Sequence, residues 1–340
     1  MNDSMMLPVD LPSLQEIPVP TPPPSPIPFF IGLVGPTGIG KSAIAVEVAK
    51  AVEGEIVALD SMQVYRHLNI GTAKPTPAEQ AGVPHHLINV VDPDEPFTAA
   101  DYARLVHPLL QEIHARGHLP LIVGGSGFYL RALRGEVFPG PREVTSIRAR
   151  LSQEAERGGP EVLHARLGRL DPQAADRIHP RDLFRIVRAL EIIEITGRPV
   201  TDLWKAHRRD LARPSVLLLG LRRERTELYG RINDRVDRML SSGLVAEVKW
   251  LLEAGYSPNM KPFQSHNYRH IVVFLQGKAS LEEATKRTKQ ETRHYAKRQM
   301  TWFRREKDIT WFDLTHVESR KIEEALIQQI QNAQEKYGTA

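Results

Sequence analysis

The sequence has no cysteine among its 340 residues. That absence excludes a disulfide framework, a thiolate nucleophile and any zinc site with cysteine ligands, and it fits a reducing compartment. No apolar run reaches the roughly 18 residues that a membrane-spanning helix needs. The N-terminus also lacks the basic flank and apolar stretch of a signal peptide. We therefore expect a cytoplasmic protein with no membrane partner.

Neither sign of charge dominates the composition. The chain carries 45 Lys and Arg against 41 Asp and Glu, which gives a net charge of +4 and a pI of about 9.2. Its 41% hydrophobic and 25% charged residues are ordinary for a globular protein. The mildly basic balance slightly favours an acidic or nucleic-acid partner.

What the sequence does contain is a complete phosphate-binding loop. The stretch GPTGIGKS satisfies the pattern G-x-x-x-x-G-K-[ST] and lies between an apolar run and a helical pattern. In such loops, backbone N–H groups and the dipole of the following helix act on phosphate oxygens, while Lys41 adds a charge and Ser42 a hydroxyl for Mg²⁺. A nucleotide is the usual ligand of this pattern. The predicted phosphate-binding residues are Gly35, Pro36, Thr37, Gly38, Ile39, Gly40, Lys41 and Ser42.

Proline is concentrated in residues 1–28, which have no helical or strand period. We expect a disordered tail there, and a ligand for a proline-binding domain is the alternative. From Phe29 onward, strand patterns alternate with helical ones, which implies a parallel, doubly wound sheet. Together with the phosphate loop, this alternation predicts an α/β fold of the P-loop NTPase type with a helical insertion domain.

The predicted boundaries follow from the same patterns. The catalytic core comprises 29–140 and 211–315, the insertion domain 141–210, and a C-terminal helix or tail 316–340. Strands are expected at 29–34, 55–60, 85–92, 119–125 and 215–221. Helices are expected at 42–51, 98–116, 180–199, 224–254 and 280–306, with a capping box at Thr98 and Asp101 and a stop at Gly197. Nothing in the chain resembles a coiled coil or a repeat, so we expect a monomer.

Asp60 ends the second predicted strand, at the edge where open parallel sheets place their ligand groups. Three roles are open to it: a Mg²⁺ ligand, a general base, or a cap for the following turn. Gly124, Gly125 and Ser126 follow another buried strand and predict a tight turn. Ser126 can donate or accept a hydrogen bond there.

Two later segments carry positive charge on one side. Arg231, Arg235 and Arg238 share one face of a predicted helix, which is either a solvated surface or an arginine clamp on phosphates. A second stripe, with Glu291 and Glu306 as its only acids, is either a solvated face or a site for a polyanion such as RNA. That stripe consists of Lys286, Lys289, Arg293, Lys297 and Arg304.

The histidines do not predict a metal site. His85 and His86 are adjacent in a predicted strand, so their side chains point to opposite faces. We expect them to have a structural or polar role. Mg²⁺ at Ser42 is the one metal that the sequence suggests.

Taken in order, several segments resemble the tRNA dimethylallyltransferase family, also called the tRNA isopentenyltransferases. They are GPTGIGKS, LDSMQVYRHLNIGTAKPT, VPHHLINVVDP, FTAADY, LIVGGSGFYLRAL, HPRDLFRIVRALEI, LYGRINDRVDRML and AKRQMTWFRRE. The resemblance covers about residues 29–313. It implies transfer of a dimethylallyl group from its diphosphate to N6 of the adenosine on the 3′ side of the anticodon, in tRNAs that read codons starting with U.

The resemblance also assigns roles to the residues already singled out. It implies that the loop holds dimethylallyl diphosphate, together with Arg235 and a Mg²⁺ ion at Ser42. Asp60 matches the family's general base, which takes a proton from N6, while Thr37 and Ser126 match positions that line the reacting centre. Loop amides and the cations then stabilise the departing pyrophosphate, where negative charge develops.

Contacts with the anticodon stem-loop of tRNA are implied in the same way. The implied residues are Asp60, Ser61, Met62, Gln63, Ser126, Arg148, Phe184, Arg185, Ile186, Val187, Arg188, Lys289, Arg293 and Lys297. Four positions depart from the family pattern. Ser126 replaces a usual threonine and keeps the hydroxyl, Phe184 replaces a usual glutamine, and in the segment 263–270 Gln264 replaces a basic residue and Asn267 a glycine. Asparagine tolerates a left-handed backbone better than most residues, so we expect a turn to persist at Asn267.

Three alternatives share part of this pattern. A cytokinin-forming relative, which prenylates free AMP, ADP or ATP, would share the loop and Asp60 but would not need the insertion domain or the basic stripe. A P-loop kinase or NTPase would turn over ATP with a magnesium-binding Asp60. A catalytically inactive RNA-binding protein would be supported by the altered segment 263–270 alone.

Overall fold

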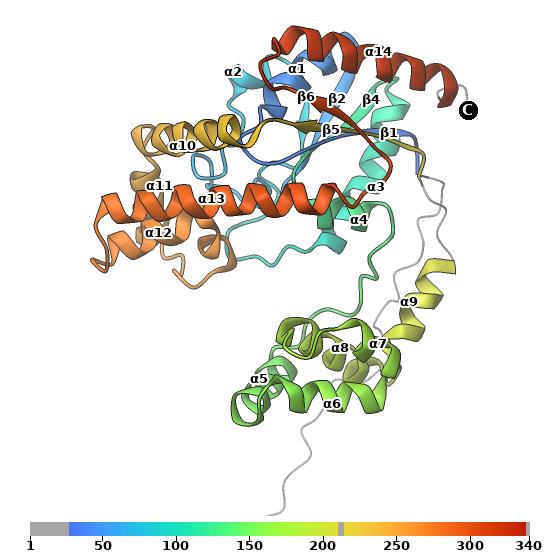
Figure 1. Cartoon of the computed structure of the whole chain (residues 1–340), viewed down its shortest axis with the longest axis vertical. Coiled ribbons are helices and arrows are strands. Elements are labelled where there is room, and N and C mark those ends of the chain that lie inside the picture. Colours follow the sequence, from blue (N-terminus) through green and yellow to red (C-terminus); the bar gives the residue numbers. More distant parts are fainter. Residues whose placement is uncertain (1–26, 210–213, 338–340) are drawn as a thin grey trace, which may run out of the picture. The chain divides into compact units, whose positions relative to one another are not determined.

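The computed structural model describes residues 27–209 and 214–337, so the tail predicted at 1–28 lies almost entirely outside the described residues. The chain forms two compact units (Figure 1). The insertion unit comprises the described residues from 138 to 209. The core unit comprises the described residues of 26–137 and 212–340.

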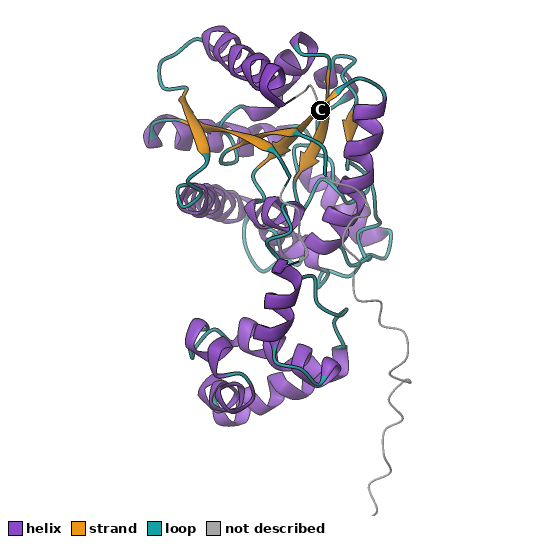
Figure 2. Ribbon diagram, turned by 90° about the vertical axis from the view of Figure 1, so that its right-hand side faces the viewer, coloured by secondary structure: helices purple, strands orange, loops and turns teal. Residues whose placement is uncertain are grey.

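The core unit is built on one parallel sheet, and both views show helices around this sheet (Figures 1 and 2). Its strands lie in the order β3-β2-β4-β1-β5-β6, and each neighbouring pair is parallel. They are β1 (Phe30–Val34), β2 (Gly54–Leu59), β3 (His85–His86), β4 (Leu119–Gly124), β5 (Val216–Arg222) and β6 (Ile309–Asp313). The three central strands β1, β2 and β4 are buried along their whole length, as expected when helices cover both faces.

Helices pack on both faces of this sheet. The helices of the core unit are α1 (Lys41–Ala51), α2 (Pro77–Gln80), α3 (Ala99–Ala115), α4 (Gly127–Leu133), α10 (Arg225–Ser241), α11 (Leu244–Glu253), the 3-10 turn η1 (Lys261–Gln264), α12 (His266–Leu275), α13 (Leu281–Phe303) and α14 (Ser319–Tyr337). Ile31 belongs to a core shared with α1 and α14, while its neighbour Phe30 belongs to a second core shared with α3 and α4. Because successive strand residues point to opposite faces, the sheet separates two apolar cores. The predicted doubly wound α/β fold is confirmed.

The described residues of the insertion unit form helices joined by short irregular segments. Its helices are α5 (Thr145–Gly158), α6 (Pro160–Leu170), α7 (Pro172–Arg177), α8 (Leu183–Thr196) and α9 (Val200–Arg209). Leu151, Leu163, Leu167 and Leu190 are fully buried together and form the centre of a core that is separate from the two of the core unit. Across the described ranges, no helix is both long and apolar enough to cross a bilayer.

Local signals placed several helix ends correctly. Thr98 and Asp101 form the predicted capping box at the start of α3, with Asp101 N donating to Thr98 Oγ1 at 3.2 Å. Gly197 closes α8 in the left-handed conformation, at φ +66°.

His86 takes a polar role, since its Nε2 lies 2.6 Å from the buried carboxylate of Glu55.

Three other expectations need correction, and some elements were not predicted. The strand predicted at 85–92 is only two residues long, because Leu87 and Asn89 adopt left-handed backbone and take the chain out of the sheet. The helix predicted over 224–254 is two helices, separated at Gly243, where φ is +101°. Strand β6 and helix α12 were not predicted. Asn267 forms no left-handed turn, since it lies in the first turn of α12.

Candidate active site

The phosphate loop joins β1 to α1, as the sequence predicts. Its glycines adopt conformations that other residues rarely do: Gly38 has φ +81°, and Gly40, the N-cap of α1, has φ +107°. A Cβ atom on Gly38 would lie 2.7 Å from the Ile232 side chain, so only glycine lets α10 pack against the loop. Since no side chain caps α1, its first N–H groups remain available to an anion.

Two cations converge on this loop. Lys41 Nζ donates to the carbonyls of Gly35 at 3.0 Å and Pro36 at 2.8 Å. Burial, followed by repulsion from Arg235, lowers the pKa of Lys41 to about 7, although attraction to Asp60 opposes the shift. Burial likewise lowers the pKa of Arg235. In the described ranges neither cation has a carboxylate within ion-pair distance, so no direct ion pair neutralises them at the loop.

The remaining loop residues differ in what they offer a ligand. The Ile39 side chain is fully buried, so only its backbone can face a phosphate. Ser42 is exposed in the first turn of α1, where its hydroxyl can act as a ligand. Arg231, one turn before Arg235 on α10, donates from Nε to Gly38 O at 3.2 Å. Helix α10 therefore faces the loop with Arg231 and Arg235, which favours the arginine-clamp interpretation over a solvated surface.

Asp60 lies at the carboxyl end of β2. Its Oδ1 accepts hydrogen bonds from Met62 N at 2.7 Å and Gln63 N at 3.3 Å, so the capping role is real. For Oδ2, no hydrogen-bond donor occurs in the described part of the chain. Burial raises the pKa of Asp60, and the two amides, Lys41 and Arg235 oppose this rise. One carboxylate oxygen is thus fixed by the turn, while the other is free to accept a proton.

Ser126 lies next to Asp60 because β4 pairs with β2. Its Oγ accepts from Ser61 N at 3.2 Å. The pKa of Tyr295 on α13 is raised to about 12 by burial and by Asp60, with hydrogen bonds to Ser126 and Gln299 opposing. The structure therefore brings together the loop, Asp60 and Ser126, as predicted from separate segments.

Gln299 is a site residue that sequence reasoning missed. Its Oε1 accepts from Thr37 N at 2.8 Å, and its Nε2 donates to Gly125 O at 2.9 Å. It therefore ties the phosphate loop to the turn that carries Ser126. The segment AKRQMTWFRRE contains Gln299, but from the sequence we interpreted this segment only through its basic residues. The sequence signal was an uncharged polar residue within a basic segment, and only the structure shows that it is buried.

In the insertion unit, several residues implied as RNA contacts are used internally. The buried carboxylate of Glu191 accepts from Arg148 Nε at 3.1 Å and from Arg188 Nη1 at 2.6 Å. Ile186 and Val187 are buried in the core, so their side chains cannot reach an RNA, and this part of the expectation is corrected. Phe184 differs, because it is 76% exposed. The Arg185 side chain is also exposed, although it pairs with Asp182 at 3.3 Å.

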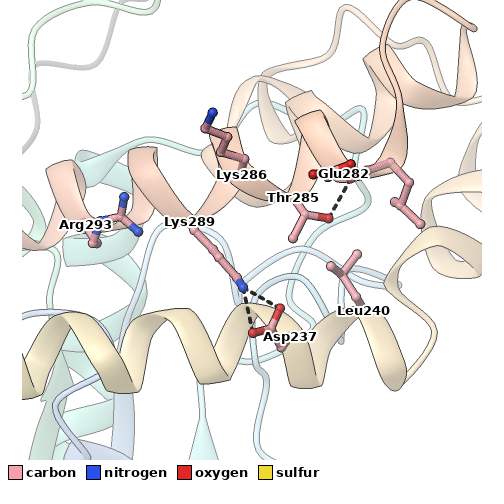
Figure 3. Close-up of a pocket in the computed structure, with 8 residues that line it drawn as sticks. Asp237, Leu240, Glu282, Thr285, Lys286, Lys289 and Arg293 are labelled. Atoms are coloured by element: carbon pink, nitrogen blue, oxygen red, sulfur yellow. Dashed lines mark hydrogen bonds and ion pairs between the residues drawn. The ribbon is translucent and has the colours of Figure 1, made fainter.

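The basic stripe on α13 faces α10 for part of its length. Figure 3 shows Lys289 reaching across to Asp237 of α10, with Nζ 2.6 Å from Oδ1. Arg293 donates to Asn233 at 2.6 Å. Asp237 of α10 thus neutralises Lys289, and the Arg293 guanidinium is held by a neutral amide. Lys286 lines an open groove of about 600 Å³ between the two helices, and Lys297 is exposed further along.

No group of three or more histidine and carboxylate side chains within 27–209 and 214–337 is arranged to hold a metal ion. A Mg²⁺ ion at Ser42 would accordingly take most of its ligands from a diphosphate and from water, as is usual for Mg²⁺ bound with phosphates.

A doubly wound parallel sheet whose first strand runs into a glycine-rich phosphate loop defines the P-loop NTPase-like class of α/β proteins. A family model described as IPP transferase matches residues 63–306. The chain belongs to this IPP transferase family, and the resemblance stated from its motifs is confirmed.

Relatives cover most of the chain. The tRNA dimethylallyltransferase of Symbiobacterium thermophilum is 49% identical over 292 residues, 86% of this chain and 91% of that protein. That of Desulfosudis oleivorans is 48% identical over 286 residues, 84% and 91% of the two chains.

Two solved structures of transferases are also similar to this chain. The full-length tRNA isopentenylpyrophosphate transferase of Bacillus halodurans superimposes with a TM-score of 0.69 and 40% identity, covering 92% of this chain and 98% of that one. A eukaryotic dimethylallyltransferase, described as acting on tRNA, gives a TM-score of 0.74 with 31% identity, over 85% of this chain and 74% of that one.

Proposed function

We propose that this protein transfers a dimethylallyl group from dimethylallyl diphosphate to N6 of the adenosine on the 3′ side of the anticodon in tRNA. The observation that carries the proposal is the placement of Asp60 beside Lys41 and Arg235. Val34, which precedes the phosphate loop, and Leu59, which precedes Asp60, are both in register with Gly124 of β4, so the loop and Asp60 leave the sheet at the same edge. The charge of Asp60 also acts on the pKa values of both cations. Family membership supports a prenyl diphosphate as the ligand of the phosphate loop.

In the proposed reaction, N6 forms a bond to the terminal allylic carbon of the substrate, and the bond from that carbon to the diphosphate oxygen breaks. The electron pair of that bond leaves with pyrophosphate, which Lys41, Arg235 and the loop amides stabilise. Asp60 Oδ2 accepts the proton lost from N6. An exocyclic amine is a weak nucleophile, so a carboxylate within hydrogen-bond reach assists its attack.

We infer that Mg²⁺ serves as cofactor. The exposed hydroxyl of Ser42, beside Lys41 at the start of α1, suits a cation that also binds diphosphate oxygens. When bound, the ion supplies further positive charge to the leaving group. Because Lys41, Asp60 and Arg235 all belong to the core unit of one chain, a monomer suffices for the chemistry. A tRNA substrate agrees with action in the cytoplasm.

For RNA binding, we propose the implied residues that the fold leaves accessible. Ser61, Met62 and Gln63 follow Asp60 directly and are partly exposed. Phe184 and Arg185 form an exposed aromatic and cationic pair, of the kind that stacks on unpaired bases and binds phosphates. On α13, Lys297 is an exposed cation, whereas Lys289 and Arg293 already have partners on α10.

The test is an assay with dimethylallyl diphosphate, Mg²⁺ and either tRNA or AMP, followed by mass spectrometry of the nucleosides. We expect N6-(dimethylallyl)adenosine in tRNA, no product from AMP, and negligible ATP hydrolysis. Asp60→Asn should abolish transfer while calorimetry still detects diphosphate binding, because the loop is untouched. Asp94→Asn, at an exposed site, is the control. Prenylated AMP with unmodified tRNA would overturn the tRNA proposal in favour of a free-nucleotide enzyme.

A further inference from the structure

The segment 69–74, which follows the Asp60 turn, is held from one side by Glu247 of α11. Its Oε2 accepts from Asn69 N at 2.9 Å and Ile70 N at 2.7 Å, and its Oε1 accepts from Gly71 N at 3.1 Å. Three successive amides therefore converge on one carboxylate, as they do around a bound anion. Oε1 also accepts from the hydroxyl of Tyr268 at 2.6 Å.

Helix α12 holds the same segment as well. Asn267 Nδ2 donates to Gly71 O at 2.6 Å, so both backbone groups of Gly71 are bound. The Tyr268 ring, which is fully buried, packs so closely that a Cβ on Gly71 would lie 2.5 Å from it. Glu247 and Tyr268 thus form a fixed seat for the segment, and Gly71 is the residue that fits it.

From this segment, hydrogen bonds lead back to Asp60. Gln63 Nε2 donates to the carbonyls of Thr72 and Ala73, each at 3.3 Å. The backbone N–H of Gln63 is one of the two donors to Asp60 Oδ1. The connection therefore has three steps. Glu247 binds the amide of Gly71, the carbonyls of the next two residues bind the Gln63 side chain, and the Gln63 amide binds Asp60.

We propose that Glu247 is a positioning residue for the reaction: by holding segment 69–74 it fixes Gln63, and through Gln63 it aims Asp60 Oδ2 at the amine of the substrate. This inference rests on the proposed function, since it takes Asp60 as the base. Glu247 itself touches neither the phosphate loop nor Asp60, so its effect on catalysis passes through the turn.

The test compares Glu247→Gln with wild type and with Glu253→Gln, a change to an exposed carboxylate on the same helix. We expect kcat for prenyl transfer to fall about 10- to 100-fold in Glu247→Gln, because a displacement of ~1 Å in a reacting group can cost on the order of 100-fold. The Kd for dimethylallyl diphosphate should not change, because the loop is independent of this seat. Tyr268→Phe, which removes only one donor to Glu247, should show a smaller loss of the same kind.

The pH–rate profile separates positioning from general destabilisation. The amides of Met62 and Gln63 lower the pKa of Asp60, so loosening the turn should move the acid limb of kcat to higher pH. Hydrogen exchange should also speed up at Asn69, Gly71 and Gln63 together. Faster exchange at Asn69 and Gly71 with no change at Gln63 or in the acid limb would overturn the inference. Exchange is measured without turnover, so an inactive wild type would count against the proposed function while leaving this coupling tested.

Discussion

At the scale of single residues, the site depends on how burial changes protonation. Burial favours the neutral form of both Lys41 and Asp60: it lowers the pKa of the first and raises that of the second. For Asp60 this makes a stronger base than an exposed aspartate. For Lys41 it means that the charge needed to bind a diphosphate depends on the diphosphate itself.

We predict that diphosphate binding takes up a proton. With a pKa of about 7, Lys41 is largely neutral at pH 8 in the free protein, and an adjacent anion raises this pKa and restores the charge. Affinity should therefore fall as the pH rises above 7. Calorimetry at pH 8 in two buffers of different ionisation enthalpy should report an uptake of up to about one proton per site. Lys41→Arg, charged throughout, should show none; equal uptake in both proteins would contradict the prediction.

At the scale of elements, α13 holds together two parts of the site that come from distant segments of the chain. Gln299 bridges the loop after β1 to the turn after β4. The glycine at 125 is required for this approach, because a Cβ there would lie 2.2 Å from Gln299 Nε2. The far end of the chain thus determines the geometry of a loop near its start.

We predict that Gln299→Ala weakens diphosphate binding and lowers stability together. The change leaves Thr37 N and Gly125 O without their partners, and an unsatisfied buried group costs about 1–3 kcal/mol. Urea unfolding and calorimetric titration with dimethylallyl diphosphate measure the two effects. Gln290→Ala, at an exposed position on α13, should change neither. Normal diphosphate affinity in Gln299→Ala would show that the bridge does not shape the loop.

In the insertion unit, a single buried acid decides which arginines are free. Glu191 binds both Arg148 and Arg188, so Arg148→Ala leaves Arg188 on the acid. We expect a destabilisation of about 1.5–3 kcal/mol, the range for losing a hydrogen bond to a charged group. Arg185→Ala should leave stability unchanged and weaken RNA binding. Urea unfolding and filter binding of an anticodon stem-loop separate the two. The reverse pattern, with Arg148→Ala affecting RNA alone, would contradict this assignment.

At the scale of the whole molecule, a net charge of +4 is too small to predict a nucleic-acid partner. What matters is which cations lack an acid nearby in space. In the part of the chain that the structure describes, Lys297 makes no ion pair, whereas Lys289 is neutralised by Asp237.

We predict that Lys297→Ala reduces the salt dependence of tRNA binding more than Lys289→Ala does. Each lost phosphate contact should lower the slope of log K against log salt concentration by about 1. Lys289→Ala should change the slope less, because its charge is already compensated. Binding measured between low and moderate salt gives both slopes, and identical slopes for the two variants would count against RNA contact at Lys297.

Much of the architecture was readable in advance, because the strand-loop-helix order around Gly35 to Ser42 and the capping box at Thr98 are local patterns. The edge strand β6 was missed because it is half exposed and lacks a long apolar run. The roles of Arg148 and Arg188 in RNA binding were implied by the family resemblance. The spacing of three residues on one helix could have paired Arg188 with Glu191, but Arg148 lies 43 residues away and could not be paired with it from the sequence.

The sequence by itself determined the phosphate loop, the alternation of strands and helices, and the family, since each depends on residues that are neighbours along the chain. Only the tertiary structure decided which charges remain available, how Gln299 ties two loops together, and how Glu247 connects to Asp60. The reason is physical: protonation and hydrogen bonding depend on burial and on partners within a few ångströms, and in this protein those partners are brought together from distant parts of the chain.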